Sequence, residues 1–260
     1  MGLFCYGAYM KILIVGDVHM SIVNMDNILD YAESHGCEKI IVLGDFGYWP
    51  HDTEGKAFLF YLNRELARRN IEVHFIKGNH DNHDYLNAYI GEKGVVEIMP
   101  KLYFHPNLTT WTWGAYVFCA VGGAYSTDGW KRTVGVDKWH GEEITMAEVY
   151  GCSGIEADVV LSHDCPISVD ITEHLNNKTD PFTKGHREKL QSIVDEICPE
   201  IVFHGHYHKR FDLTGTHTRG TFRNIGLASN KQTLALQCLV FDCDAMYHDF
   251  SVRHFNIQAD

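Results

Sequence analysis

The sequence predicts an α/β fold of two sheets, one in each half of the chain, with helices outside each sheet. Strands and helices alternate along the first half, which favours a parallel sheet covered by helices. Buried strands return in the second half around an amphipathic helix, and a mostly β pattern follows. No linker, internal repeat or change of composition divides the chain. We therefore expect one domain over residues 10–260.

The first half supplies the predicted parallel strands. Short apolar runs predict strands at residues 11–16, 39–43 and 71–77. Helices are predicted between them at residues 22–36 and 54–69. In the second helix Phe58, Leu62 and Leu66 recur every four residues, so they share one face that can pack on the sheet.

The second half is richer in β pattern. A strand pair is predicted at residues 108–113 and 116–122, with Gly114 at the turn. A polar, glycine-containing loop follows at residues 126–141, and then a helix near residues 142–150. Buried strands at residues 158–161 and 200–203 flank a helix at residues 184–198. The remaining strands are predicted at residues 211–214, 221–224, 234–241 and 248–255.

The composition limits the partners. The chain has 34 acidic and 22 basic residues, a formal charge of −12. This balance argues against duplex nucleic acid, because such binding depends on the neutralisation of phosphates by Lys and Arg. A small phosphate-bearing substrate stays open, since bound metal ions can reverse the sign of the local field. The apolar runs are far shorter than the roughly 20 residues of a membrane helix, so we expect no membrane partner.

The N-terminus and the cysteines indicate a cytoplasmic protein. Residues 1–9 lack the basic and long apolar regions of a signal peptide, and we expect them to be a leader before a domain that begins at Met10. The eight cysteines contain no CxxC pair, which favours reduced and mostly buried thiols. A homodimer is the default assembly for a soluble protein of this kind.

Five polar motifs follow five predicted strands, each at the point where the strand ends. They are Asp17-Val18-His19, Gly44-Asp45, Gly78-Asn79-His80-Asp81, Ser162-His163-Asp164 and His204-Gly205-His206. Ligands bind at the carboxyl ends of parallel strands in open α/β folds, so residues as distant as 17 and 206 can converge there. His208 extends the last motif and would either face the cleft or, as we expect, lie at a solvated strand end.

The candidate ligands are two carboxylates, four imidazoles and one amide, with no cysteine among them. They are Asp17, Asp45, His19, His163, His204, His206 and Asn79. Such a set suits Mn, Fe, Zn, Ni or Co, and it is large enough for two ions that share a carboxylate. Two ions can acidify a bridging water and hold both oxygens of an in-line displacement. We therefore expect two divalent cations, manganese in first place, and hydrolysis of a phosphate ester.

The order of these motifs resembles the calcineurin-like metallophosphoesterase superfamily, from about residue 11 to residue 206. The resemblance implies a four-layer α/β/β/α sandwich of two facing mixed sheets flanked by helices. It also implies the metal ligands: Asp17, His19 and His206 on the first ion, Asp45 as the bridge, and Asn79, His163 and His204 on the second. His80 resembles the catalytic histidine that stabilises the transition state or protonates the leaving oxygen. Asp81 would orient the His80 ring.

The second motif departs from the protein Ser/Thr phosphatase branch, which continues as Gly-Asp-x-Val-Asp-Arg-Gly. Here the motif is Gly44-Asp45-Phe46-Gly47-Tyr48-Trp49, without the arginine that grips the phosphate. This departure argues against a protein phosphatase. Family members with such a second motif are commonly phosphodiesterases, so the resemblance implies that branch. Tyr48 and Trp49 would either stack on a flat substrate group or pack under a loop.

We therefore expect hydrolysis of a small phosphodiester by attack of a metal-bridging hydroxide, with cyclic nucleotides such as 2′,3′-cAMP as candidate substrates. A phosphomonoesterase acting on nucleotides or phosphoproteins, a metal-dependent nuclease and a non-catalytic scaffold of the same fold are the alternatives. On the loop of residues 126–141, Trp130 and Trp139 would either line a substrate cleft or, as we expect, pack in the core or at its rim. Lys131 and Arg132 are further candidates for holding a phosphate.

Overall fold

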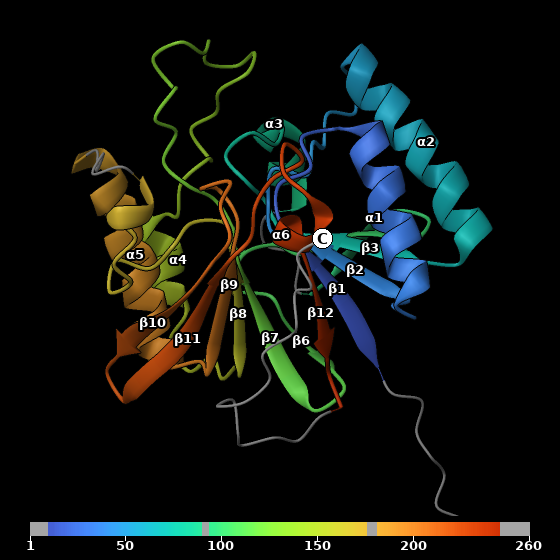
Figure 1. Cartoon of the computed structure of the whole chain (residues 1–260). Helices are drawn as coiled ribbons and strands as arrows, with labels where there is room; N and C mark the ends of the chain where they lie inside the picture. The colour runs from blue at the N-terminus through green and yellow to red at the C-terminus, as the bar shows by residue number, and fades with distance from the viewer. Residues whose placement is uncertain (1–9, 90–93, 176–180, 245–260) are drawn as a thin grey trace, which may run out of the picture.

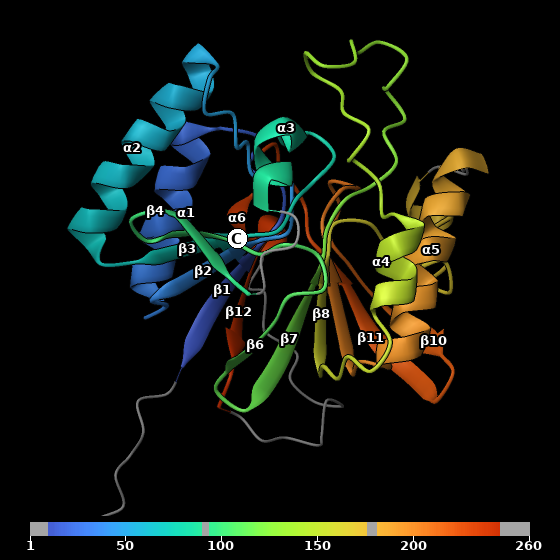
Figure 2. The ribbon, with the colours of Figure 1, turned by 180° about the vertical axis from the view of Figure 1, so that it is seen from behind.

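Two six-stranded sheets face each other, and helices cover the outer face of each sheet (Figures 1 and 2). This is a computed structural model, and it describes residues 10–89, 94–175 and 181–244. The arrangement confirms the expected α/β/β/α sandwich. Residues 1–9 and the strand predicted at residues 248–255 lie outside the described residues, and the domain boundary at Met10 stays a prediction.

The two sheets have the same plan, with four parallel strands in the middle and an antiparallel strand at each edge. In the first sheet the parallel strands are β1 (Lys11–Val15), β2 (Lys39–Val42), β3 (Glu72–Phe75) and β5 (Leu102–Phe104), between β12 (Cys238–Asp242) and β4 (Val96–Met99). In the second they are β11 (Gly220–Gly226), β9 (Ile201–His204), β8 (Val159–Ser162) and β7 (Tyr116–Val121), between β10 (Phe211–His217) and β6 (Thr110–Trp113).

Four helices lie on the outer faces of the sheets. The first sheet is covered by α1 (Ile22–Ser34) and α2 (Thr53–Arg69), the second by α4 (Met146–Gly151) and α5 (Pro181–Ile197) (Figure 1). Two shorter helices, α3 (His83–Leu86) and α6 (Leu234–Gln237), complete the set of α-helices in the described residues. Side chains define the starts of α1 and α2, because Ser21 accepts from the N–H of Asn24 and Asp52 accepts from that of Glu54.

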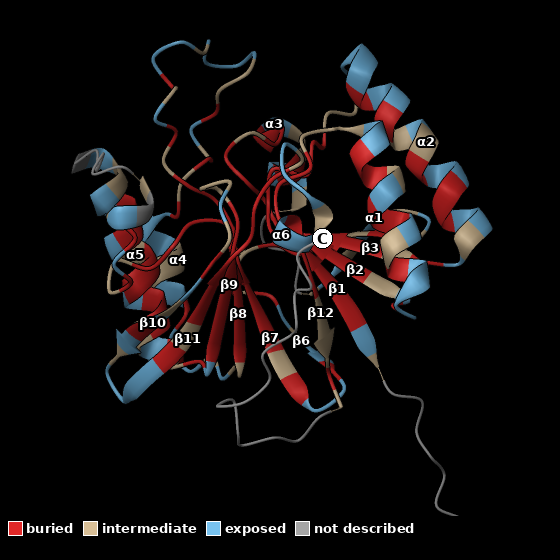
Figure 3. Ribbon diagram, viewed as in Figure 1, coloured by how far each residue is buried: buried red, intermediate tan, exposed pale blue. Residues whose placement is uncertain are grey.

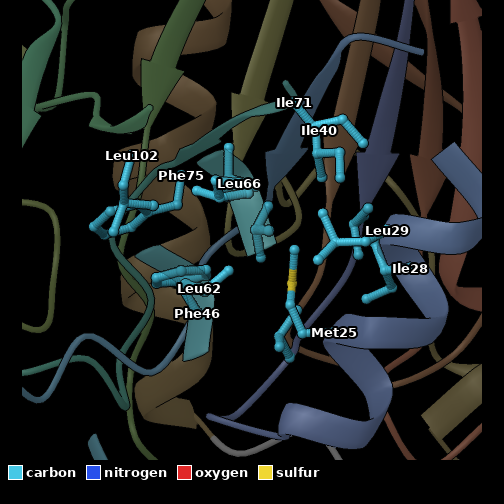
Figure 4. Close-up of a cluster of buried hydrophobic side chains, with 14 of the residues drawn as sticks. Met25, Ile28, Leu29, Ile40, Phe46, Leu62, Leu66, Ile71, Phe75 and Leu102 are labelled. Carbon is cyan, nitrogen blue, oxygen red and sulfur yellow. The ribbon is translucent and has the colours of Figure 1, made fainter. Parts of the chain in front are cut away.

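Period-two alternation along the strands builds three apolar layers. In β1, Leu13 and Val15 face the helices, whereas Ile12 and Ile14 face the second sheet. Figure 4 shows the outer layer, where α1 and α2 side chains meet those of the first sheet, and Figure 3 shows the buried strand centres. A third layer lies between the second sheet and α5. The carboxyl ends of the strands are therefore held rigidly on both faces.

Two predicted elements differ in the structure. The strand predicted at residues 234–241 begins as helix α6, and only its second part is β12. This strand pairs with β1, so it belongs to the first sheet and the two sheets do not divide strictly by halves of the chain. The helix predicted near residue 142 begins at Met146, because Thr145 and Glu148 form a capping box. Strands β4 and β5 and helix α3 were not predicted.

The seven cysteines in the described part of the chain are free, and six of them are buried. This confirms, for those seven, the reduced and mostly buried thiols that their spacing predicted. No helix in the same residues is long and apolar enough to cross a membrane.

Two buried histidines at one rim of the sandwich predict sensitivity to acid. Nδ1 of His74 lies 2.9 Å from Nε2 of His105, and His105 is fully buried. Burial, with a smaller effect of His74, holds the pKa of His105 well below its ordinary value. The unfolded chain binds this proton below about pH 6.5, so the free energy of unfolding should fall as the pH drops.

The contribution of His105 is measurable by urea unfolding at two pH values. Between about pH 7 and pH 5.5 one such histidine lowers the free energy of unfolding by about 1.3 kcal/mol. We expect His105→Gln to lose this part of the pH dependence. The exposed His35 supplies the control, His35→Gln, which should keep it. Equal pH dependence in both variants would refute the assignment.

Candidate metal centre

The five polar motifs follow β1, β2, β3, β8 and β9, all of them central parallel strands. Their carboxyl ends meet where the two sheets come together, as the sequence predicts. Nδ1 of His163, after β8, donates to the carbonyl of Leu43 on the other sheet at 2.7 Å. The N–H of His206, after β9, donates to Oδ1 of Asp17 at 3.0 Å. The site is therefore built across the seam between the sheets.

The loops at this seam approach one another too closely for ordinary side chains. A Cβ on Gly44, where φ is +86°, would lie 2.4 Å from Nδ1 of His163. Four functional candidates also adopt left-handed backbone: His19 (φ 48°), Asp45 (φ 46°), His206 (φ 66°) and His208 (φ 55°). Such strain costs on the order of 1 kcal/mol or more per residue and concentrates at functional sites. The surrounding packing must hold these side chains in place.

The first group of possible metal ligands is Asp17, His19 and His208. One ligand atom from each lies within 4.8 Å of the others. Nε2 of His208 is 2.9 Å from Oδ2 of Asp17 and 3.2 Å from Nε2 of His19. Although His208 is this close, no donor is well aligned with Oδ2 of the fully buried Asp17. A buried carboxylate oxygen facing two imidazole nitrogens fits a cation better than it fits a hydrogen-bonded network.

The second group is Asp17, Asp45 and His163, all buried and again within 4.8 Å. Oδ1 of Asp45 is 3.4 Å from Nε2 of His163, and its Oδ2 is 3.9 Å from Nε2 of His19. One oxygen of Asp45 thus faces each group, which is the arrangement a bridging carboxylate needs. Oδ1 of Asn79 is 2.9 Å from Nε2 of His163 and adds an oxygen to this side.

The electrostatics of the centre favour positive charge. Burial opposes ionisation of Asp17 and Asp45, yet nearby histidines hold the pKa of Asp17 below its usual value and that of Asp45 well below it. Burial likewise opposes a charged His163, but Asp45 and then Asp17 raise the pKa of His163 to about 10. Two buried carboxylates require a cationic partner. The residues therefore fit divalent cations bound by oxygen and imidazole.

The structure changes the interpretation of the last motif. His204, predicted as a ligand of the second ion, is fully buried, and both of its ring nitrogens are engaged. Nδ1 donates to the carbonyl of Gly205 at 3.0 Å, and Nε2 accepts from Nδ2 of Asn224 at 3.1 Å. Neither nitrogen has a lone pair left for a metal. Phe203 of β9 points into the layer between the sheets, so the next residue, His204, points to the opposite face of its sheet. There it packs beside Phe211.

His208 lies with Asp17 and His19, the place that the prediction had given to His206. The sequence signal was Gly205-His206-Tyr207-His208, which overlaps His204-Gly205-His206 and moves the ligand pair two residues along the chain. His206 stays near the centre, with its ring centroid 5.0 Å from that of His163. Burial lowers the pKa of His206 to about 4, so it is neutral and able to ligate. His208 lies beside His19, and its side chain is 35% exposed just after the end of β9.

His80 lies beside the first group, with its ring 37% exposed and its centroid 5.8 Å from that of His19. Asp81 does not orient this ring, contrary to the prediction. Its buried carboxylate accepts from the N–H groups of Gly47, Tyr48 and Gly78 at 2.7 to 3.1 Å. Asp81 therefore ties the loops after β2 and β3 together. The carboxylate near the ring belongs to Asp128, whose Oδ2 is 3.7 Å from Nε2 of His80.

The loop of residues 126–141, the middle loop, is joined to the centre by a polar network that the sequence did not reveal. Nδ2 of Asn79 donates to Oγ of Ser126 at 2.9 Å, and this hydroxyl donates to Glu142 at 2.5 Å. Arg132 donates to the same Glu142 oxygen at 2.8 Å. Its Nε lies 3.1 Å from Oδ1 of Asp128. The network thus runs from a candidate ligand to the carboxylate beside His80.

Comparison with known proteins identifies the chain. Residues 10–210 match the sequence profile of the calcineurin-like phosphoesterases. The chain belongs to this family. Solved structures of similar fold include TT1561 of Thermus thermophilus, with a TM-score of 0.51, 10% identity, and coverage of 91% of this chain and 100% of that one. GAP50 of Plasmodium has a TM-score of 0.50 and 11% identity, covering 87% of this chain and 74% of that one. Curated protein sequences gave no match.

The aromatic residues around this calcineurin-like phosphoesterase centre divide into packed and exposed. Tyr48 is buried against Phe75, so packing accounts for it. Trp49 donates from Nε1 to the carbonyl of His80 at 2.9 Å and packs edge-on against the buried Trp139. Trp130, which was expected to pack, is 80% exposed on the middle loop, because that loop rises above the sandwich (Figure 1, yellow-green).

Proposed function

We propose that this phosphoesterase is a hydrolase of phosphodiesters that works with two divalent ions. The observation that carries the proposal is the pair of ligand groups sharing Asp17 at the carboxyl ends of both sheets. Membership of a family that is typically dinuclear supports it. The donor set of carboxylate, amide and imidazole suits manganese, and also iron, zinc, nickel or cobalt.

The residues divide between the two ions according to the geometry. Asp17, His19 and His208 would hold the first ion, and Asn79, His163 and His206 the second, with Asp45 facing both. When bound, such ions lower the pKa of a water and neutralise charge on the phosphate oxygens. Asp45 also accepts from the N–H of His80 at 2.8 Å, so the same carboxylate fixes the loop that carries His80.

His80 is suited to assist the leaving group. Its ring is partly exposed beside the first ligand group, and the packed loop after β3 limits its movement. A histidine in this position can give a proton to the oxygen that departs from phosphorus, which accelerates such steps by about 10²- to 10⁴-fold. Trp49 adds to this support through its hydrogen bond to the His80 carbonyl.

The charges near the centre support a diester in preference to a monoester. A phosphodiester carries one negative charge less than a fully ionised monoester, and it needs fewer cationic side chains. Arg132 on the middle loop has a side chain only 7% exposed, held between Asp128 and Glu142. These two ion pairs occupy the Arg132 guanidinium, so it does not serve to bind a phosphate.

Exposed groups on the middle loop favour a substrate with a flat part, such as a cyclic nucleotide. Trp130 is 80% exposed, and Nζ of Lys131 lies 4.8 Å from the centre of its ring. An exposed indole beside a cation can stack on a nucleobase while the cation meets a phosphate or ribose oxygen. This supports 2′,3′-cAMP as one substrate to test.

A non-catalytic binding role is the second candidate. GAP50, which shares the fold, is described as the anchor in the inner membrane complex of Plasmodium. The two ligand groups and the partly exposed His80 favour an enzyme over a scaffold. Bound metal without turnover on any phosphate ester would favour the scaffold.

Substrate preference is the direct test of the proposed function. With Mn²⁺ added to the metal-depleted full chain, we expect hydrolysis of bis-p-nitrophenyl phosphate and of 2′,3′-cAMP. We expect kcat/KM for p-nitrophenyl phosphate to be lower by about tenfold or more, which corresponds to about 1.4 kcal/mol. A chelator should remove all three activities. Preference for the monoester, or activity without metal, would overturn the proposal.

A further inference from the structure

We propose that Asp128, on the middle loop, is the residue that positions His80 for proton donation, a role that rests on the proposed function. The acidic neighbour of His80 in sequence, Asp81, is unable to do so because three backbone N–H groups occupy its carboxylate. Asp128 is the one carboxylate paired with the His80 ring among the described residues. It is 48 positions away in the chain.

The two oxygens of Asp128 have different partners. Oδ2 lies 3.7 Å from Nε2 of His80, and Oδ1 lies 3.1 Å from Nε of Arg132. An exposed carboxylate alone would rotate freely and would hold its partner weakly. The contact with Arg132 restricts that rotation and leaves the second oxygen directed to the imidazole.

Arg132 is itself fixed, which makes it a suitable anchor for Asp128. Its side chain is 7% exposed, and it donates to Glu142 at 2.8 Å and to the carbonyl of Asp137 at 2.8 Å. Glu142 is 5% exposed and also accepts from the N–H of Trp139 at 2.9 Å. Because the buried pair of Arg132 and Glu142 is costly to break, Arg132 is a rigid ion-pair partner for Asp128.

The same hydrogen-bond network also contacts Asn79, one of the candidate metal ligands. Ser126, at the start of the middle loop, joins Glu142 to Nδ2 of Asn79. Asn79 and His80 are consecutive residues, so the middle loop contacts both of them from one side. Its network therefore sets the direction of the His80 ring relative to the ligand Asn79.

The proton step follows from this arrangement. As the phosphorus–oxygen bond to the leaving group breaks, its electron pair stays on the leaving oxygen, which takes a proton from a ring nitrogen of His80. The ring nitrogen that faces Asp128 is Nε2, so the donated proton comes from Nδ1. Asp128 receives no proton and acts by holding the ring. Asp128 is thus a positioning residue, and His80 is the proton donor.

A spectroscopic test of the contact does not depend on turnover. The full chain loaded with diamagnetic Zn²⁺ is examined by the ¹H–¹⁵N spectrum of its histidine rings, with His80 assigned by its loss in His80→Gln. We expect Asp128→Asn to shift the ring nitrogens of His80. Asp137→Asn removes a charge from the same loop and should leave them in place. Unchanged His80 resonances in Asp128→Asn would overturn the proposal.

A kinetic test separates positioning from a general structural role. Asp128→Asn should lower kcat about tenfold on 2′,3′-cAMP, whose alkoxide leaving group needs a proton, and less than about twofold on bis-p-nitrophenyl phosphate. In the His80→Gln background it should have no further effect, because the residues act as a unit. Equal losses on both substrates, or additive losses, would contradict the inference. If no diester is hydrolysed at all, the proposed function fails, while the spectra still decide the role of Asp128.

Discussion

Replacing Asp45 by asparagine should remove almost all metal-dependent hydrolysis, with kcat lower by at least about a thousandfold. The loss corresponds to about 4 kcal/mol at 1.36 kcal/mol per factor of ten. Asp45 faces His163 with one oxygen and His19 with the other, so its charge serves both sides of the centre. Elemental analysis should find less than two equivalents of metal per chain. Steady-state kinetics with bis-p-nitrophenyl phosphate measure the loss.

Asparagine is the informative substitution because it preserves shape. Its amide oxygen can still accept from the N–H of His80, so the loop after β3 stays in place. Thermal unfolding followed by circular dichroism checks that the variant is folded. Asp52→Asn is a control that removes a carboxylate from the N-cap of α2, where asparagine caps equally well. A fully active Asp45→Asn protein with two bound ions would refute the bridging role.

His208→Ala and His204→Ala should have opposite consequences, and this is the second large effect we expect. Loss of His208 removes a nitrogen that lies 2.9 Å from Asp17, so metal content and kcat should both fall, kcat by about a hundredfold or more. Loss of His204 removes the acceptor that faces Nδ2 of Asn224 in the interior, which should lower the free energy of unfolding by about 2 kcal/mol. Its metal content should stay near that of the wild type.

The two variants control each other, since both delete an imidazole from the same short segment. Metal analysis, kinetics and urea unfolding are made on both proteins at one temperature and pH. Loss of metal from His204→Ala with metal retained in His208→Ala would restore the original assignment of the motif. The contrast therefore tests which histidine pair ligates.

The strands and their terminal motifs were predictable because their signals are local. An apolar run followed at once by Asp17 or Asp45 marks both a buried strand and the point where it ends. Parallel pairing then brings the motifs together, and the structure has all five at one seam. Strand β12 was harder, because its place beside β1 depends on pairing between residues more than 220 positions apart.

The side-chain network was beyond the reach of sequence patterns. No sequence spacing indicates a contact among Asp128, Arg132 and Glu142. From the sequence alone, each is expected to be a solvated residue of a polar loop. Only the folded chain shows that the Arg132 side chain is 7% exposed and that Asp128 faces His80. The misplaced histidine has another cause: His204 and His206 fit the motif as well as His206 and His208 do, and the alternation of β9 decides between them.

Because the candidate ligands come from both sheets, metal binding at the seam would contribute to the free energy of unfolding. Asp17 and Asp45 come from one sheet, and His163 and His208 from the other, so an ion held by them joins parts of the chain that separate on unfolding. Ligation of the native state alone adds about 2.7 kcal/mol of stability when free metal is a hundredfold above its dissociation constant. If this centre binds metal as proposed, removing the metal should lower the activity and the free energy of unfolding together.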